Sequence, residues 1–255
     1  MAIIEFETDG HVAVITINRP EARNAVSGDV ARGIEAAIDK IEGDDSLWLG
    51  ILTGVPPVFS AGADLKEINA GRAGDLQTPR GGFAGISRRD RSKPIIAAVD
   101  GPALAGGTEI TLACDLIVAS TTAQFGIPEV KRSLIAAGGG LFRLPRKLPF
   151  NIAMELALTG DPIDAERAHR FGLVNVLCEP GDALAKAKEL AKRIEANAPI
   201  AVRESRRVVY EAMTEDEETG WTLSAKAMAV AMHSEDMKEG LTAFIEKRPP
   251  NWAGR

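Results

Sequence analysis

A strand, a glycine turn and the start of a helix follow one another in Lys93-Pro-Ile-Ile-Ala-Ala-Val-Asp-Gly-Pro-Ala-Leu-Ala-Gly-Gly-Thr-Glu109. Residues 94–99 form a short apolar run, which is typical of a strand buried on both faces of a parallel sheet. Gly106 and Gly107 let the backbone turn sharply before residues 108–112, which are expected to be helical. This order of buried strand, turn and helix indicates the α/β class.

The same alternation extends to both sides of this stretch. Strands are predicted at residues 11–17, 47–53, 116–119 and 174–177, and helices at residues 30–41, 141–146, 151–158 and 165–170. Ser27 is a suitable cap for the first of these helices, because its hydroxyl accepts a hydrogen bond from a free N–H at the helix start. Together these segments predict one α/β core.

The pattern changes after about residue 182, where only helical periodicity remains. Helices are predicted there at residues 183–196, 200–213, 220–232 and 237–246. We therefore divide the chain into a core of residues 1–195 and a carboxy-terminal helical region of residues 196–255. This region is too thin to bury a core of its own, so we expect it to pack on the main domain or on a neighbouring subunit. Oligomerisation is expected.

Residues 70–93 differ in composition from the rest of the core, because they hold five glycines, five arginines and few large apolar side chains. This composition predicts a mobile surface loop. Such a loop either shapes a neighbouring site or is an excursion without function, and the sequence favours neither alternative.

Composition limits the class of protein. Hydrophobic residues make up 45% of the 255 residues, which suffices for a substantial core. The net charge of −6 argues against a nucleic-acid partner. Because no apolar run reaches the ~18 residues of a membrane span, no membrane partner is expected. The two cysteines, Cys114 and Cys178, suit neither a disulfide framework nor a thiolate metal site, so we expect a reducing cytoplasm.

Two acidic residues lie in apolar surroundings directly after structure-forcing elements. Glu109 follows Gly106-Gly107-Thr108, and Glu129 follows Gly126-Ile127-Pro128. Burial raises the pKa of a carboxyl group, so two buried glutamates would suit general acid/base chemistry. The alternative is that both are ordinary turn or helix-start carboxylates that face water. Residue types alone leave both readings open.

Two turns of small residues are suited to expose backbone N–H groups. Residues 101–108 resemble a phosphate-binding loop, but Gly107 occupies the lysine position, which disfavours nucleotide hydrolysis. Residues 59–64 form a similar turn, and Ser60 within it lacks both the nucleophile motif and a histidine base. We therefore interpret both turns as donors of N–H groups to an anion or a developing oxyanion.

These motifs together resemble the crotonase superfamily of acyl-CoA enzymes. The resemblance rests on residues 59–66 and 93–109, on Cys114-Asp115, on residues 125–129 and 157–160, and on residues 243–248 near the end. It spans nearly the whole chain. It implies a core of ββα turns wound into a spiral, with carboxy-terminal helices that build homotrimers, often as a dimer of trimers.

The resemblance also implies a set of site residues. The amides of Ala63 and Gly106 would hold the thioester oxygen of an acyl-CoA substrate. Retention of both Glu109 and Glu129 matches the enoyl-CoA hydratases, which add water to a trans-2-enoyl-CoA, and it leaves open which glutamate is the acid. No metal or other cofactor is implied, since CoA is part of the substrate. Contacts with CoA would involve Ala61, Asp64, Leu65, Lys66, Phe244 and Lys247.

Two departures concern the acyl end of the substrate. Ala137 stands where typical hydratases have a glycine that lines the catalytic water pocket, and Ala105 replaces the first glycine of a common triple. Residues 81–85 and 143–145 are closest to the carnitinyl-CoA dehydratase branch, which provides an alternative substrate with a cationic acyl group. A third alternative is a non-catalytic relative that binds acyl-CoA or RNA.

Overall fold

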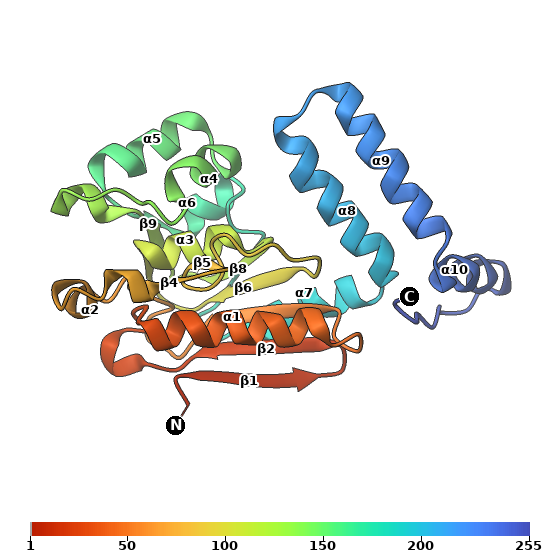
Figure 1. The fold of residues 1–255 in the computed structure, drawn as a ribbon, viewed down its shortest axis with the longest axis horizontal. Helices are drawn as coiled ribbons and strands as arrows, with labels where there is room; N and C mark the ends of the chain where they lie inside the picture. Colours follow the sequence, from red (N-terminus) through yellow and green to blue (C-terminus); the bar gives the residue numbers. More distant parts are fainter. Residues whose placement is uncertain (1) are drawn as a thin grey trace.

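The computed structural model describes residues 2–255 and is built around a six-stranded sheet (Figure 1). The strand order is β1-β2-β3-β6-β8-β11, and only β1 runs antiparallel to its neighbour. The strands are β1 (Ile4–Asp9), β2 (Val12–Ile17), β3 (Leu49–Gly54), β6 (Ile95–Val99), β8 (Leu116–Ser120) and β11 (Val176–Cys178). All but β1 lie at predicted positions. Strand β1, an edge strand with charged residues along it, was not predicted from the sequence.

A second, smaller sheet has the order β10-β9-β7. Its short strands come from successive turns of the fold. Its strands are β7 (Ala103–Leu104), β9 (Gln124–Gly126) and β10 (Ile163–Asp164). The chain passes from β6 through β7 into helix α3 (Gly106–Ala113), and from β8 through β9 into the 3-10 turn η3 (Pro128–Arg132). After β3, Ser60 pairs with Ala103 before helix α2 (Leu65–Asn69) begins. Each turn of the spiral is therefore strand, short strand and helix.

Helices cover both faces of the large sheet. Helix α1 (Gly28–Gly43) begins at Ser27, whose side chain accepts a hydrogen bond from the amide of Val30, as expected of the cap. Helix α7 (Ala183–Glu195) packs on the opposite face. Alternate residues of β6 contact the two cores, because successive strand side chains point to opposite faces. This burial explains why the parallel strands have continuous apolar sequences.

The remaining helices form two groups. Beside the second sheet lie α4 (Gly140–Lys147), α5 (Phe150–Thr159) and α6 (Ala165–Arg170). The carboxy-terminal group consists of α8 (Pro199–Glu211), η4 (Ala212–Thr214), α9 (Glu217–Met232) and α10 (Glu235–Glu246). Helices α8 and α9 form an antiparallel pair outside the ββα body, with α10 beyond it (Figure 1). All of these helices were predicted, and the division at residue 195 stays a prediction.

The expectation of a mobile surface loop at residues 70–93 is wrong for residues 76–93, many of which are buried, whereas residues 70–75 are exposed. The segment forms η2 (Ala73–Leu76) and a short hairpin of β4 (Gln77–Thr78) and β5 (Gly82–Phe83), and the Phe83 side chain is 7% exposed. It packs directly on α1, since a Cβ atom at Gly85 would lie 2.2 Å from the carbonyl oxygen of Ala31. Gly85 therefore serves close packing, whereas a Cβ atom at Gly71 or Gly74 would meet nothing within 4 Å.

Two basic residues of this segment are also buried, against the expectation from composition. Arg91 Nη1 donates to Asp115 Oδ2 at 2.5 Å. Lys93 Nζ donates to the carbonyl oxygens of Ile41 at 2.6 Å and Asp44 at 2.8 Å. Buried cations are tolerated when they are paired or hydrogen-bonded, as both are here. The segment therefore belongs to the core beside the site described below.

Candidate active site

Two backbone turns meet at the amino end of α3. Gly62 has φ +86°, and a Cβ atom there would lie only 2.6 Å from the backbone nitrogen of Gly106. Within residues 2–255, the amides of Ala63 and Gly106 have no hydrogen-bond acceptor. Two free N–H groups beside a helix start form a binding place for a negatively charged oxygen. The structure thus brings together the two turns that were predicted to donate N–H groups.

Side chains hold the first of these turns in place. Ser60 Oγ donates to the carbonyl oxygen of Asn24 and accepts from the amide of Gly62, a structural use that fits its exclusion as a nucleophile. The Asp64 carboxylate accepts from the amide of Lys66 and forms an ion pair with Arg19 at 2.7 Å. The contacts of the Asp64 carboxylate therefore stabilise the turn. Its expected contact with CoA stays a prediction.

The other expected CoA contacts lie in two separate places. Ala61 is half-buried within the turn, while Leu65 and Lys66 are exposed at the start of α2. Phe244 on α10 is 83% exposed, and Lys247 directly follows that helix. Because α10 lies at the other end of the molecule from α2 (Figure 1), one protomer does not bring these two groups together.

Glu109 lies in the first turn of α3 and is 4% exposed. Its Oε1 atom accepts a 2.9 Å hydrogen bond from the amide of Gly140, the first residue of α4. Burial raises the pKa of Glu109 to about 7, and the charge of Glu129 acts in the same direction, while amide hydrogen bonds from Gly140 and Gly138 lower it. The carboxyl group therefore changes its ionisation near neutral pH.

Glu129 comes from η3 and completes the pair. Its Oε2 atom is buried and has no hydrogen-bond partner within the described residues. Burial raises the pKa of Glu129 as well. The alternative reading, in which both carboxylates face water, is wrong for Glu109, while Glu129 is half-buried with its Oε2 atom out of contact with water. A buried carboxyl oxygen without a partner is costly, and such groups are more common at sites where protons are transferred.

Phe83, Gly138 and Arg143 were not identified as site residues from the sequence. A Cβ atom built on Gly138 would lie 2.6 Å from Glu109 Oε2 and 3.1 Å from the ring of Phe83, and the same ring lies 2.4 Å from a Cβ atom built on Gly106. Arg143 on α4 donates to the carbonyl oxygen of Gly138 at 3.4 Å. The run of three glycines before α4 was the available signal, since it marks a close backbone approach. Ala137, next to this run, is exposed, and its role at the water pocket stays a prediction.

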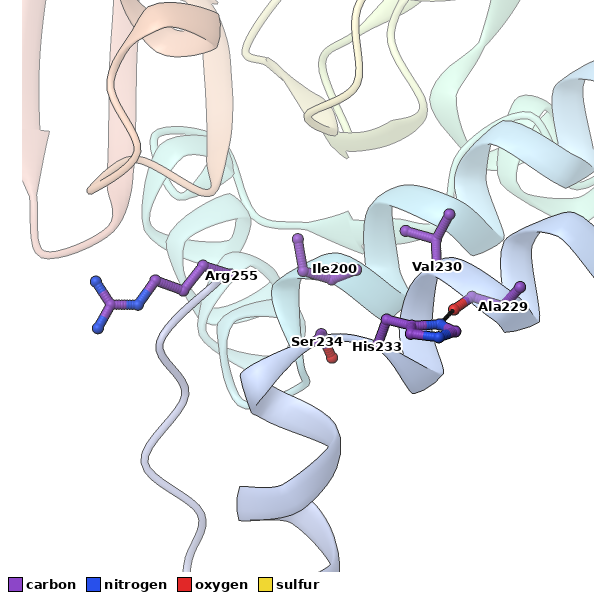
Figure 2. A pocket seen from close by; sticks show the side chains of 6 residues that line it. All are labelled: Ile200, Ala229, Val230, His233, Ser234 and Arg255. Atoms are coloured by element: carbon purple, nitrogen blue, oxygen red, sulfur yellow. Dashed lines mark hydrogen bonds between the residues drawn. The ribbon is translucent and has the colours of Figure 1, made fainter.

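Two surface hollows lie elsewhere in the molecule. One, of about 520 Å³, lies between α8, α9 and the carboxyl terminus, and Ile200, Ala229 and Val230 form the apolar part of its lining (Figure 2). Its histidine, His233, uses Nδ1 in a hydrogen bond to the carbonyl oxygen of Ala229. The other, of about 620 Å³, separates α8 from the body. Neither hollow is lined by Glu109 or Glu129. The candidate site is therefore identified by its free amides and its two carboxyl groups, and not by a hollow.

Residues 2–255 contain no cluster of three or more His, Cys, Asp or Glu side chains placed to hold a metal ion. In the same range, no helix combines the length and apolar character needed to cross a membrane. Both cysteines are free, and Cys114 is fully buried in the core.

Comparisons with known proteins agree with this geometry. The family model described as Enoyl-CoA hydratase/isomerase matches residues 7–255. An enoyl-CoA hydratase of Mycobacterium tuberculosis is 41% identical, over 98% of this chain and 96% of the relative. A short-chain-enoyl-CoA hydratase of Clostridium acetobutylicum is 40% identical, over 95% and 94%. A carnitinyl-CoA dehydratase of Salmonella arizonae is 37% identical, over 96% of both.

Solved structures agree as well. The crystal structure of an enoyl-CoA hydratase from Mycobacterium tuberculosis H37Rv has a TM-score of 0.96 and 48% identity to this chain, with both chains fully covered. The predicted crotonase-like fold is thereby confirmed.

Proposed function

The chain belongs to the enoyl-CoA hydratase/isomerase family, and we propose that it adds water across the 2,3 double bond of a trans-2-enoyl-CoA to give a 3-hydroxyacyl-CoA. It is an enzyme of the hydro-lyase class. The observation that carries this proposal is the pair of carboxyl groups of Glu109, which is buried, and Glu129, which is half-buried, whose pKa values are both raised by burial. Hydration needs one group to activate water and another to supply a proton.

The reaction begins with polarisation of the thioester. The amides of Ala63 and Gly106 hold the carbonyl oxygen, which makes C3 electrophilic and stabilises the enolate that forms on attack. Each such donor is typically worth about 3 to 4 kcal/mol of barrier. The position of Gly106 at the helix start adds the favourable end of the α3 dipole.

The two glutamates then divide the proton transfers. Glu109 in its ionised form takes a proton from water as the oxygen forms a bond to C3. Glu129 in its protonated form gives its proton to C2 of the enolate. A proton then passes from Glu109 to Glu129 to restore the starting state, so that one water molecule is consumed in each turnover. Glu129 Oε2 has no hydrogen-bond partner within residues 2–255, so it can accept this proton.

The carnitinyl-CoA dehydratase reading remains the alternative, because relatives with that name match the chain over nearly its full length. A quaternary ammonium group favours aromatic or acidic surroundings. Trp221 and Trp252 both lie in the carboxy-terminal region, where Trp252 Nε1 donates to the carbonyl oxygen of Ala196. The ring of Phe83 lies beside Gly106 and Gly138, and the substrate panel below distinguishes the two acyl groups.

The non-catalytic reading, a scaffold that binds acyl-CoA or RNA, fits less well. It gives no reason to bury the Glu109 carboxyl group and to leave the buried Glu129 Oε2 atom without a hydrogen bond, an arrangement that costs folding free energy. The net charge of −6 also disfavours RNA.

We also propose a homotrimer or a dimer of trimers in the cytoplasm that acts in fatty acid β-oxidation. Large apolar side chains are exposed along the carboxy-terminal helices, among them Trp221, Met228, Leu241, Phe244 and Ile245. Exposed apolar surface of this extent is typical of subunit interfaces. In such an assembly Phe244 and Lys247 would reach CoA in a neighbouring subunit.

A panel of acyl-CoA thioesters tests the proposed function. The purified protein should remove the absorbance of the conjugated enoyl thioester from at least one member of a series that runs from crotonyl-CoA to long-chain, crotonobetainyl and steroid side-chain enoyl-CoA. No metal should be needed. If no member is hydrated, hydration is the wrong reaction. If only the crotonobetainyl ester is hydrated, the carnitinyl alternative is correct.

A further inference from the structure

The guanidinium group of Arg143 connects two segments that border Glu109. Nη2 donates to the carbonyl oxygen of Ser87 at 2.6 Å, and Nη1 donates to the carbonyl oxygen of Gly138 at 3.4 Å. Gly139 has φ +116°, and a Cβ atom there would lie 2.1 Å from Nη1. Only glycine therefore allows the guanidinium to lie this close to the loop.

This loop is the one that holds the carboxylate. Gly138 contacts Arg143 through its carbonyl group, and Gly140 donates its amide to Glu109 Oε1. Residues 138–140 therefore connect the guanidinium group of Arg143 to the carboxylate of Glu109. A planar, forked guanidinium is suited to bridge two carbonyl groups in fixed geometry.

The charges around Glu109 are few. Within residues 2–255, Glu129 of η3 faces it with a negative charge and Arg143 of α4 faces it with a positive one, and the second favours the ionised carboxylate. Arg143 itself is faced by Tyr210 of α8 and by the cations Arg91 and Arg146. No other charged group therefore takes the place of Arg143 beside the carboxylate.

We propose that Arg143 is a positioning residue for Glu109. It holds residues 138–140 against residues 81–88, so that the Gly140 amide stays directed at the carboxylate, and it supplies the positive charge that keeps the carboxylate ionised while water attacks. The inference rests on the proposed function in one respect only, namely that Glu109 acts as the base.

The chain offers a matched control. Arg146 lies on the same helix, and the two guanidinium groups both lie near the ring of Phe142, at 5.1 Å for Arg143 and 5.6 Å for Arg146. Arg146 is exposed and has no hydrogen bond to the loop within the described residues. Replacing it removes the same charge from the same helix and leaves the loop untouched.

Three variants test the proposal: Arg143→Gln, Arg143→Lys and Arg146→Gln. In Arg143→Gln we expect kcat to fall by roughly 10- to 100-fold with KM nearly unchanged, because a small displacement of a catalytic group has an effect of this size. The acidic limb of its pH–kcat profile should move to higher pH, because loss of the positive charge makes ionisation of Glu109 harder. Arg143→Lys keeps the positive charge but lacks the forked guanidinium group. The acidic limb of its pH–kcat profile should therefore stay in place, while kcat falls about tenfold. Arg146→Gln should match the unmodified enzyme.

The proposal is overturned if Arg143→Gln keeps the original acidic limb, or if Arg146→Gln moves it equally. A purely structural role would lower the melting temperature and leave the limb in place. Should Arg143→Gln not fold, an unchanged kcat in Arg143→Lys overturns the proposal. The carboxyl carbon resonance of ¹³C-labelled Glu109 gives a readout that needs no turnover. If its titration moves to higher pH in Arg143→Gln although no thioester is hydrated, the inference stands and the proposed function fails.

Discussion

Glu109 Oε1 lies 2.9 Å from the backbone nitrogen of Gly140, so the first turn of α3 and the first residue of α4 meet at one carboxylate oxygen. The amide directs that oxygen and leaves the other, Oε2, beside Gly138. A hydrogen bond from an amide favours the ionised form, but burial outweighs it, and the pKa is raised to about 7. The group is thus held in place and still able to exchange a proton at neutral pH.

Replacing Glu109 by Gln should lower kcat by about 10²- to 10⁴-fold, because a general base is lost. The amide oxygen of Gln still accepts from Gly140, so the loop should keep its position. Calorimetric titration with a saturated acyl-CoA should show an unchanged dissociation constant. Hydration at the original rate would exclude Glu109 as the base.

Replacing Glu129 by Gln should remove proton transfer at C2. In D₂O the unmodified enzyme should exchange the C2 protons of a saturated acyl-CoA, which is followed by NMR of the thioester. We expect Glu129→Gln to lose this exchange and Glu109→Gln to retain most of it, because only Glu129 is assigned to C2. The opposite pattern would reverse the acid and base assignments.

Glu109 should make stability depend on pH. Its folded-state pKa of about 7 exceeds the ordinary value of 4.5, so the folded protein binds this proton more tightly than the unfolded chain does. The free energy of unfolding therefore falls as pH rises from 4.5 to 7, by about 3 kcal/mol in total. Glu109→Gln should be more stable than the unmodified protein at pH 8 and not at pH 4.5. Urea unfolding at one protein concentration measures this, and equal differences at both pH values would contradict it.

Gly138→Ala should displace the catalytic carboxylate. The added Cβ atom would lie 2.6 Å from Glu109 Oε2 and 3.1 Å from the Phe83 ring, so one of them has to move. We expect kcat to fall by about 100-fold with little change in KM. Gly43→Ala is the control, because a Cβ atom there meets nothing within 4 Å. Full activity of Gly138→Ala would mean that the position of Oε2 is not critical.

Gly62→Ala should disturb the pair of free amides. The new Cβ atom would lie 2.6 Å from the Gly106 nitrogen, in a residue with φ +86°. Loss of one donor costs about 10²- to 10³-fold in kcat. Gly172→Ala carries the same backbone strain, at φ +84°, with nothing within 4 Å of the added atom. If both variants lose activity equally, strain and not the amide is responsible.

Local sequence was sufficient for most of the fold and for part of the site. The buried strands β3 and β6 were predicted because each is a short, continuous apolar run between turns. Gly106 and Glu109 are three residues apart at one helix start, so their proximity follows from helix geometry alone. Strand β1 was not predicted, although its acidic residues Glu5, Glu7 and Asp9 alternate with Ile4 and Phe6 as in a strand with one face toward water.

Long-range packing settled the rest. The hydrogen bond between Glu109 and Gly140 spans 31 residues and uses a backbone amide, which has no side chain that a sequence pattern could reveal. The burial of Arg91 depends on Asp115, 24 residues away, and therefore residues 70–93 resembled an exposed loop in composition. Periodicity reports which face of an element is apolar, whereas a site made from several loops depends on which loops the packed core brings into contact.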